Sequence, residues 1–292
     1  MTTVAFIGLG IMGAPMAANL VTAGFDVVGY NRSRAPVDRL VEQGGTAADS
    51  VADAVGDADV VVTMLPDSPD VEQVALGDDG ILAHAQSGSL YIDMSTIRPA
   101  TAVRVADAAR DVGVRPLDGP VSGGEQGAID GALSIMVGGE PADFDDAGAV
   151  LDAVGSTIVH VGPSGSGQTV KAANQLIVAG TYQLVAEAIV FLEAHGVDTD
   201  AAVKVLAGGL AGNTILQRKA AGMLRREFQP GFRIDLHHKD MGILLAAARE
   251  TGVAIPFGAL AAQFIAALRA QGHGDLDHSA MLKLVEQLSG RA

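Results

Sequence analysis

Hydrophobic residues follow two different patterns along the chain, and the change falls near residue 162. Before it, short runs rich in β-branched residues alternate with alanine-rich stretches. Several runs are apolar throughout, as expected for parallel strands covered on both faces. The predicted strands are Val4–Ile7, Asp26–Tyr30, Asp59–Met64, Ser89–Met94, Arg115–Asp118, Ser134–Val137 and Thr157–Val161. The stretches of helical composition are Ala14–Ala23, Ala35–Gln43, Val51–Ala54 and Ala100–Val112. This alternation predicts a doubly wound α/β domain.

The second half has a helical pattern throughout. After the glycine-rich segment 162–167, one long periodic apolar stretch runs from Gln168 to His195 and is followed by Gly196, where a helix C-cap glycine belongs. The later helical stretches are Asp200–Leu206, Thr214–Arg226, Asp235–Thr251, Phe257–Ala270 and His278–Leu288. We find no convincing strand among them. We therefore predict two domains, residues 1–162 and residues 163–292, the second all-helical and led by the long helix.

Composition and charge narrow the functional classes. The 292 residues are 49% hydrophobic, which is enough for a large core. Cysteine is absent, so the chain has no disulfide framework, thiol nucleophile or thiolate metal site, which suits a reducing compartment. No uninterrupted apolar run approaches the roughly 20 residues that span a bilayer. The net charge of −15 argues against a general nucleic-acid binder. We expect a cytoplasmic protein that binds neither membrane nor nucleic acid.

A glycine motif lies directly after the first predicted strand. Gly8-Leu9-Gly10-Ile11-Met12-Gly13 has the spacing G-x-G-x-x-G, which in a chain with 37 Gly is also typical of a tight turn. Here a strand precedes the motif, a helical pattern follows it, and a second strand ends about 20 residues later, as a dinucleotide-binding loop requires. The first glycine would allow the turn, the second the approach of a pyrophosphate, and the third close helix–strand packing. Backbone N–H groups at the helix start would hold the phosphates. We predict a Rossmann-type NAD(P)-binding domain.

The end of the second predicted strand bears on the choice of cofactor. A cofactor with a free ribose 2′-OH usually meets Asp or Glu there, but Tyr30-Asn31-Arg32-Ser33-Arg34 contains no acid. Arg32 could pair with a 2′-phosphate, which Asn31 and Ser33 could also hydrogen-bond. Alternatively, Arg32 and Arg34 lie on an ordinary surface loop. We favour NADP over NAD.

These residues and several later blocks resemble the β-hydroxyacid dehydrogenase family, which includes 3-hydroxyisobutyrate dehydrogenases. FIGLGIMGAPMAANL (6–20) is similar to the family's N-terminal signature. The later blocks follow in the family's order and cover essentially the whole chain: TMLPDSPDV (63–71), DMSTIRPAT (93–101), DGPVSGGEQGAIDGALSIMVGG (118–139), VKAANQ (170–175) and FRIDLHHKD (232–240). Within the family, GGLAGNTILQRKA (208–220), PGFRIDLHHKD (230–240) and GDLDHSA (274–280) resemble the tartronate semialdehyde (2-hydroxy-3-oxopropionate) reductase branch most.

The resemblance implies an oxidoreductase. Its expected activity is the reversible, NAD(P)H-dependent reduction of tartronate semialdehyde to glycerate. The alternatives are the same chemistry on 3-hydroxyisobutyrate, glyoxylate or succinic semialdehyde. A modest pocket change could switch the substrate, because one methyl group is worth only about 1–3 kcal/mol of discrimination. The resemblance and the long apolar helix together suggest a homodimer or homotetramer.

The resemblance also places residues around cofactor and substrate. Met64, Leu65 and Pro66 would lie beside the cofactor and Thr96 near its nicotinamide, and both segments follow predicted strands at the end where open α/β sheets bind ligands. Ser95 and Thr96 could equally form a helix N-cap. Ser122, Gly123 and Gly124 would bind the substrate carboxylate through a hydroxyl and open backbone N–H groups. A plain turn would use the same residue types.

Lys171 is the predicted catalytic residue. It shares a helix face with Asn174 and Gln175, near a helix start where the macrodipole disfavours a cation. The alternative is an exposed helix lysine, the common fate of lysine. In the family's role, its ammonium would protonate the carbonyl oxygen as hydride arrives, and its pKa would have to fall from about 10.4. Whether Asn174 or Gln175 contacts the substrate stays open.

A second lysine belongs to the block 232–240. The resemblance places Lys239 over cofactor and substrate, with Asp240 pairing with Lys239 or Lys171 and Phe232 closing the pocket. The alternative is a solvated helix start with Asp235 as N-cap. His237-His238 lies in no H-E-x-x-H arrangement, so we predict no metal site.

A function of another class is also conceivable. The chain could be an NADP-binding interaction protein without catalysis, although such a protein would have no use for Lys171.

Overall fold

The structure is a computed structural model that describes residues 2–291. The chain forms two compact units, residues 1–171 and residues 172–292. Helix α10 (Ser166–Ala194) begins in the first unit and continues in the second. The domain boundary near residue 162 stays a prediction.

The first unit is built on a nine-stranded sheet in the order β3-β2-β1-β4-β5-β6-β8-β7, with β9 paired to β8. β1 to β6 run parallel, whereas β8 is antiparallel to β6 and β7. The strands are β1 (Thr3–Ile7), β2 (Asp26–Tyr30), β3 (Thr46–Ala47), β4 (Val60–Thr63), β5 (Leu90–Asp93), β6 (Arg115–Asp118), β7 (Val121–Ser122), β8 (Leu133–Gly139) and β9 (Gly155–Gly162).

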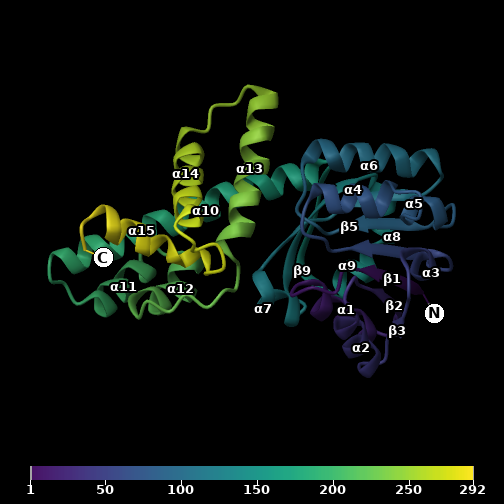
Figure 1. The fold of residues 1–292 in the computed structure, drawn as a ribbon, viewed down its shortest axis with the longest axis horizontal. Helices are drawn as coiled ribbons and strands as arrows, with labels where there is room; N and C mark the ends of the chain where they lie inside the picture. Colours follow the sequence, from purple (N-terminus) through teal and green to yellow (C-terminus); the bar gives the residue numbers. More distant parts are fainter. Residues whose placement is uncertain (1, 292) are drawn as a thin grey trace. The chain divides into compact units, whose positions relative to one another are not determined.

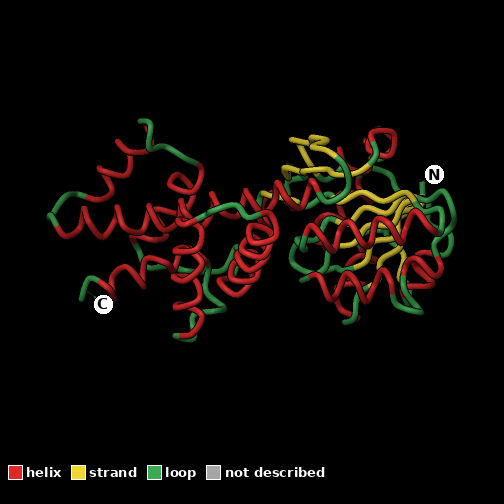
Figure 2. The backbone as a smooth tube through the Cα atoms, turned by 90° about the horizontal axis from the view of Figure 1, so that it is seen from above, coloured by secondary structure: helices red, strands yellow, loops and turns green. Residues whose placement is uncertain are grey.

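Helices cover both faces of this sheet. Figure 1 shows α4, α5 and α6 on one face and α1 and α2 on the other, and Figure 2 shows the strands between helices. The helices of this unit are α1 (Gly13–Thr22), α2 (Arg34–Glu42), α3 (Val51–Val55), α4 (Ser68–Leu76), α5 (Ile81–His84), α6 (Pro99–Asp111), α7 (Gly124–Ile129), α8 (Pro141–Asp146) and α9 (Gly148–Asp152).

The apolar strands are explained by this two-sided burial. Successive side chains of a strand point to opposite faces. In β1, Val4 and Phe6 enter the core with α1 and α2, whereas Ala5 and Ile7 enter the core with α3, α4 and α6. The doubly wound Rossmann-type fold predicted from the sequence is confirmed.

The order of the strands indicates where a ligand binds. β1 lies between β2 and β4, so the chain reverses its direction across the sheet at this point. Open parallel sheets bind ligands beyond the carboxyl ends of the strands at such a switch point. The segments after β1, β2, β4 and β5 are therefore the first places to look for a site.

The second unit is helical. α10 packs against α13 (Ile234–Thr251) and α14 (Pro256–Ala270) in one core, and against α12 (Thr214–Leu224) and α15 (Met281–Leu288) in another. α11 (Thr199–Gly208) and a short 3-10 helix, His278–Ala280, complete it. Within residues 172–291 the only extended pairing is an isolated bridge between Arg233 and Asp277. The predicted helical second half is confirmed.

Helix α10 has the length and hydropathy of a membrane span. It has 29 residues and a mean hydropathy of 1.6 in its most apolar window, of which half is buried in the structure. Core helices of folded domains have the same properties, and α10 contributes to both cores of the second unit. The sequence prediction considered only uninterrupted runs and missed the high average hydropathy of this helix.

Candidate active site

The glycine loop after β1 has three glycines with different surroundings. Gly8 has φ +100°, and a Cβ there would lie 2.4 Å from the carbonyl oxygen of Met64. A Cβ on Gly13 would lie 1.9 Å from the carbonyl oxygen of Gly8. At Gly10 a Cβ would meet nothing within 4 Å. Packing thus requires the outer two glycines, whereas Gly10 borders open space.

Helix α1 starts at the end of this loop. No side chain caps its first backbone N–H groups, since the N-cap residue is Met12. Uncapped N–H groups at a helix N-terminus attract anions. The loop therefore fits the pyrophosphate of a dinucleotide in both space and charge.

The residues after β2 have distinct roles. The Asn31 side chain accepts a hydrogen bond from the N–H of Leu9 at 3.1 Å and donates to Ser33 Oγ at 2.8 Å, which ties this segment to the glycine loop. Arg34 forms ion pairs with Asp38 and Asp49. Arg32 is exposed and makes no hydrogen bond or ion pair within residues 2–291. Of the two arginines, Arg32 is available to a ligand.

A buried hydroxyl–carboxylate network shapes the ends of β4 and β5. Thr63 Oγ1 donates to Asp93 Oδ1 at 2.7 Å. Ser95 Oγ accepts from the N–H of Leu65 at 2.8 Å, so it holds the Met64-Leu65-Pro66 turn beside the segment that carries Thr96. The N-cap interpretation of Ser95 and Thr96 is wrong, because α6 begins only at Pro99, with Arg98 as its N-cap.

Lys171 is buried, with 7% of its surface exposed. Its Nζ donates a hydrogen bond to the carbonyl oxygen of Val121 at 2.7 Å. Val121 belongs to β7 and directly precedes Ser122, Gly123 and Gly124, so the ammonium lies beside the predicted carboxylate-binding turn. The interpretation of Lys171 as an exposed helix lysine is wrong, because the chain brings β7 over this helix face.

The turn after β7 has an unusual backbone. Gly123 and Gly124 have φ values of +149° and +68°, which L-residues with a side chain rarely adopt. A Cβ on Gly124 would meet nothing within 4 Å, so its backbone borders open space. Ser122 is half-buried at its start. The Ser122 hydroxyl and the accessible backbone N–H groups of this turn could donate hydrogen bonds to a small carboxylate.

Sequence reasoning assigned no role to two residues around the start of α10. The buried carboxylate of Asp118 accepts from the N–H groups of Gly165 at 2.7 Å and Gln168 at 2.9 Å. The Gln168 side chain accepts from the N–H of Ile97 at 3.0 Å and donates to the carbonyl oxygen of Ser95 at 2.8 Å. Burial raises the pKa of Asp118 to about 6 and outweighs the two backbone N–H groups, which lower it. The sequence did contain a signal for Asp118, because this acid stands at the carboxyl end of a predicted strand, where ligands bind.

In the second unit, four predicted site residues form one connected polar chain. Asn174 Nδ2 donates to Gln175 Oε1 at 2.8 Å, and Gln175 Nε2 donates to Asp240 Oδ2. Lys239 Nζ pairs with Asp240 Oδ1 at 2.9 Å. Gln175 and Asp240 are buried, whereas Asn174 is half-buried at the end of this chain. Asp240 therefore pairs with Lys239, as one of the two predicted alternatives required.

The segment before α13 packs on histidines. The Phe232 ring lies 5.3 Å from the ring of His278 and 5.8 Å from that of His237, centroid to centroid. Burial raises the pKa of the neighbouring Asp277, but His278, Ser279 and Lys219 lower it more and hold it at about 2. Asp235 is not the N-cap, because α13 begins at Ile234, and it pairs with Arg269 instead. Within residues 2–291, no group of three His, Asp or Glu side chains could hold a metal ion.

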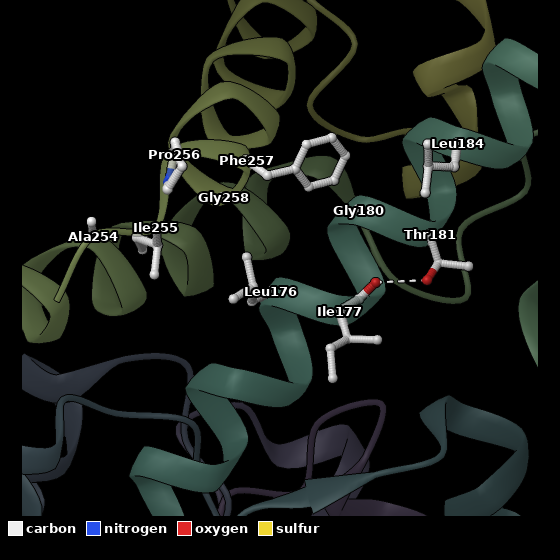
Figure 3. A pocket seen from close by; sticks show the side chains of 10 residues that line it. All are labelled: Leu176, Ile177, Gly180, Thr181, Leu184, Ala254, Ile255, Pro256, Phe257 and Gly258. Atoms are coloured by element: carbon white, nitrogen blue, oxygen red, sulfur yellow. Dashed lines mark hydrogen bonds between the residues drawn. The ribbon is translucent and has the colours of Figure 1, made fainter.

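The second unit also has an apolar groove of about 410 Å³. Figure 3 shows the residues that line it, among them Leu176, Ile177 and Leu184 of α10 and Phe257 at the start of α14. Thr181 supplies the hydroxyl of the lining, and this hydroxyl already donates to the carbonyl oxygen of Ile177 at 2.7 Å. No charged side chain lines the groove, so it does not suit a small carboxylate.

Comparison with known protein families also indicates a dinucleotide-binding protein. Residues 3–162 match the family model described as the NAD-binding domain of 6-phosphogluconate dehydrogenase. Residues 165–285 match that described as NAD-binding of NADP-dependent 3-hydroxyisobutyrate dehydrogenase. A dinucleotide fold, its glycine loop and these matches define the class as an NAD(P)-dependent oxidoreductase.

Individual relatives resemble the chain over its full length. The chain is 38% identical to 2-hydroxy-3-oxopropionate reductase of Escherichia coli, with 97% of each covered. It is 38% identical to NAD-dependent L-serine dehydrogenase of Pseudomonas aeruginosa, with 100% of each covered. The structure of Mycobacterium tuberculosis 3-hydroxyisobutyrate dehydrogenase with L-serine superimposes with a TM-score of 0.89 at 36% identity, covering 98% of this chain and 99% of that one. The chain belongs to the 3-hydroxyisobutyrate dehydrogenase-like family of β-hydroxyacid dehydrogenases. Its cofactor is NAD or NADP.

Proposed function

We propose that this enzyme reversibly reduces tartronate semialdehyde to glycerate with NADPH, and that Lys171 is its proton donor. The observation that carries the proposal is the 2.7 Å hydrogen bond from Lys171 Nζ to the carbonyl oxygen of Val121. This bond holds the Lys171 ammonium at Val121, the residue directly before Ser122. The Ser122 hydroxyl and the two glycines that follow it are suited to bind a carboxylate. A small acid bound there has its carbonyl within reach of that ammonium, since the two groups are neighbours in a short molecule.

The chemistry divides between cofactor and protein. When bound, the nicotinamide supplies a hydride to the carbonyl carbon, so that NADPH becomes NADP⁺ and the aldehyde, with one added proton, becomes an alcohol. Ser122 and the backbone of Gly123 and Gly124 hold the carboxylate. Lys171 gives the proton to the carbonyl oxygen, and in the direction of oxidation it takes that proton from the hydroxyl.

NADP is the proposed cofactor because of the residues after β2. Arg32 has no partner within residues 2–291, whereas Arg34 has two acids. A guanidinium on this loop matches a 2′-phosphate, and the loop offers no acid for a free 2′-OH.

The connected polar side chains of the second unit are the next candidates for ligand binding. We propose that Asn174, Gln175, Asp240, Lys239 and Phe232 contribute to binding, as the family resemblance implies. The pairing of Lys239 with Asp240 and the half-buried positions of Asn174 and Lys239 support such roles, because both of these side chains keep part of their surface open to solvent.

Lys171→Ala tests the catalytic role. We expect wild-type protein to oxidise NADPH with tartronate semialdehyde and the variant to lose at least about 10²-fold in kcat, the usual scale of general acid catalysis. NADPH affinity, measured by fluorescence, should stay the same, because the glycine loop does not involve Lys171. Lys204→Ala, on the exposed side of α11, is the matched control.

The same assay separates the alternatives. Glyoxylate and succinic semialdehyde are tested with NADPH, whereas L-serine and 3-hydroxyisobutyrate, which are already alcohols, are tested with NADP⁺. Relatives of the chain carry the names of dehydrogenases for these last two compounds. A higher kcat/KM on one of these compounds would make it the substrate in place of tartronate semialdehyde, while the proposed hydride and proton transfer would stay the same. Equal rates in wild type and Lys171→Ala would contradict the proposed mechanism. NADPH binding without turnover on any substrate would indicate the non-catalytic interaction protein.

We also propose that the chain forms a homodimer or homotetramer. The support is the exposed apolar side of α10, which the groove of Figure 3 adjoins. The cytoplasmic location stays a prediction from the sequence.

A further inference from the structure

The start of helix α10 is fastened to two strand ends of the first unit. Asp118, the last residue of β6, accepts hydrogen bonds from the backbone N–H of Gly165, directly before α10, and from that of Gln168, in its first turn. Gln168 in turn bonds through its side chain to the backbone of Ser95 and Ile97, after β5. Both side chains are buried, at 5% and 1% exposure. Lys171 follows Gln168 by three residues, so the two side chains share one side of the helix.

We propose that Asp118 and Gln168 form a clamp that fixes the first turn of α10 and thereby positions the Lys171 ammonium for proton transfer. The inference rests on the proposed function of Lys171. Neither clamp residue is assigned a contact with substrate or cofactor, so both are positioning residues.

The Lys171 side chain is flexible, so its backbone must be fixed for the ammonium to be positioned. Its ammonium, which donates to the carbonyl oxygen of Val121, ends a flexible four-carbon stem with four rotatable bonds, so the location of the ammonium depends on where its backbone is held. The segment 118–121 therefore holds α10 twice, at its first turn through Asp118 and at the ammonium through Val121.

An ordinary helix cap does not explain Asp118. Asp198 caps α11 by accepting from the N–H of Ala201 at 3.1 Å, and this contact is exposed. The buried Asp277, which caps the 3-10 helix, also pairs with the Lys219 ammonium at 2.9 Å, whereas Asp118 accepts from backbone N–H groups. Asp118 is a buried carboxylate, which is costly to desolvate, and Ser or Thr would cap the helix without that cost. Its surroundings are also fitted to it, because a Cβ on Gly138 would lie 2.4 Å from Asp118 Oδ1 and one on Gly167 would lie 2.8 Å from Oδ2.

Asp118→Asn is the decisive variant. It keeps the size of the side chain but replaces one acceptor oxygen by a donor, so one of the two backbone N–H groups loses its partner. We expect kcat to fall by about tenfold to a hundredfold, because small displacements of a reacting group cost this much. The Kd of NADPH should stay within about twofold, since the glycine loop and Arg32 are untouched. Asp198→Asn, the same substitution at a cap without proposed function, should leave both unchanged.

A second readout follows the lysine itself. Competitive labelling with acetic anhydride, read by peptide mass spectrometry, compares Lys171 with the exposed Lys204. Labelling of Lys171 relative to Lys204 should rise in Asp118→Asn and stay at the wild-type value in Asp198→Asn. A clamp that only stabilised the fold would leave this ratio unchanged in the folded variant.

The outcomes separate the clamp from the proposed function. If Lys171→Ala is inactive while Asp118→Asn keeps wild-type kcat and labelling, the clamp is wrong and the function stands. If Lys171→Ala is as active as wild type, the proposed function is wrong and the clamp with it. Should Asp118→Asn not fold, Gln168→Ala decides: it removes the side-chain contacts to residues 95 and 97, and an unchanged kcat there overturns the proposal.

Discussion

At the scale of single residues, two arginines after β2 differ in what surrounds them. Arg34 is paired with Asp38 and Asp49 at the surface, whereas Arg32 has no partner within residues 2–291. Arg32 lies on the loop that follows the second strand of the dinucleotide fold, where such folds recognise the cofactor's ribose, whereas Arg34 is the first residue of α2. The sequence already favoured Arg32 as the partner of a 2′-phosphate, and the structure supports this choice because Arg34 is paired with two acids.

Arg32→Ala tests the choice. We expect its Kd for NADPH to rise about tenfold to a hundredfold, the scale of a lost hydrogen bond to a charged group. Its Kd for NADH should change little, because NADH has no 2′-phosphate. Arg34→Ala is the matched control and should affect neither cofactor strongly. Equal weakening of both cofactors in Arg32→Ala, measured by fluorescence titration, would contradict the proposed role.

At the scale of elements, the glycine loop separates packing from binding. Gly13 brings α1 onto β1 so closely that a side chain would meet the carbonyl oxygen of Gly8 and the ring of Phe6. Gly10 borders open space. One motif thus contains glycines required by the fold and a glycine that the fold alone does not require.

A pair of alanine variants tests this division. Gly13→Ala should lower the free energy of unfolding by about 1–3 kcal/mol or more, the cost of overpacking. Gly10→Ala should leave the melting temperature unchanged and raise the Kd of NADPH by at least about tenfold, because its methyl group occupies the space proposed for the pyrophosphate. The loop does not bind the cofactor if Gly10→Ala has wild-type affinity.

At the scale of the whole molecule, α10 presents a row of exposed apolar side chains. Ile177, Leu184 and Phe191 are 68%, 56% and 63% exposed and lie seven residues apart, which places them along one side of the helix. The first two also line the groove with Phe257 (Figure 3). A contiguous apolar surface of this kind is typical of a protein interface. A second copy of the chain is the occupant that we propose.

Ile177→Glu tests this surface. We expect size-exclusion chromatography with light scattering to give an oligomer for the wild type and a smaller species for the variant, because a carboxylate would be buried without a partner in the interface. Leu210→Glu, at a fully exposed position after α11, is the control and should keep the wild-type mass. A monomeric wild type, or an unchanged mass in Ile177→Glu, would contradict the oligomer.

Much of the fold could be predicted because element type is encoded locally. The strands β1, β2 and β6 and the long helix appear in the sequence as apolar runs or helical periodicity within a few residues of their true ends. Several short elements were not predicted: β3 and β7 have two residues each, and α5 and α7 have four and six. Such segments are too short for a periodic pattern and exist only through their tertiary neighbours.

The sequence by itself determined the class of domain, the glycine loop and the identity of the candidate lysine, since each depends on a local pattern or on a motif. Only the tertiary structure decided that Lys171 is buried against Val121 and that Asp118 holds the first turn of its helix. Both contacts join residues 50 positions apart. A charged group can be buried only where distant segments supply its hydrogen-bond partners, and these partners are determined by how the chain folds.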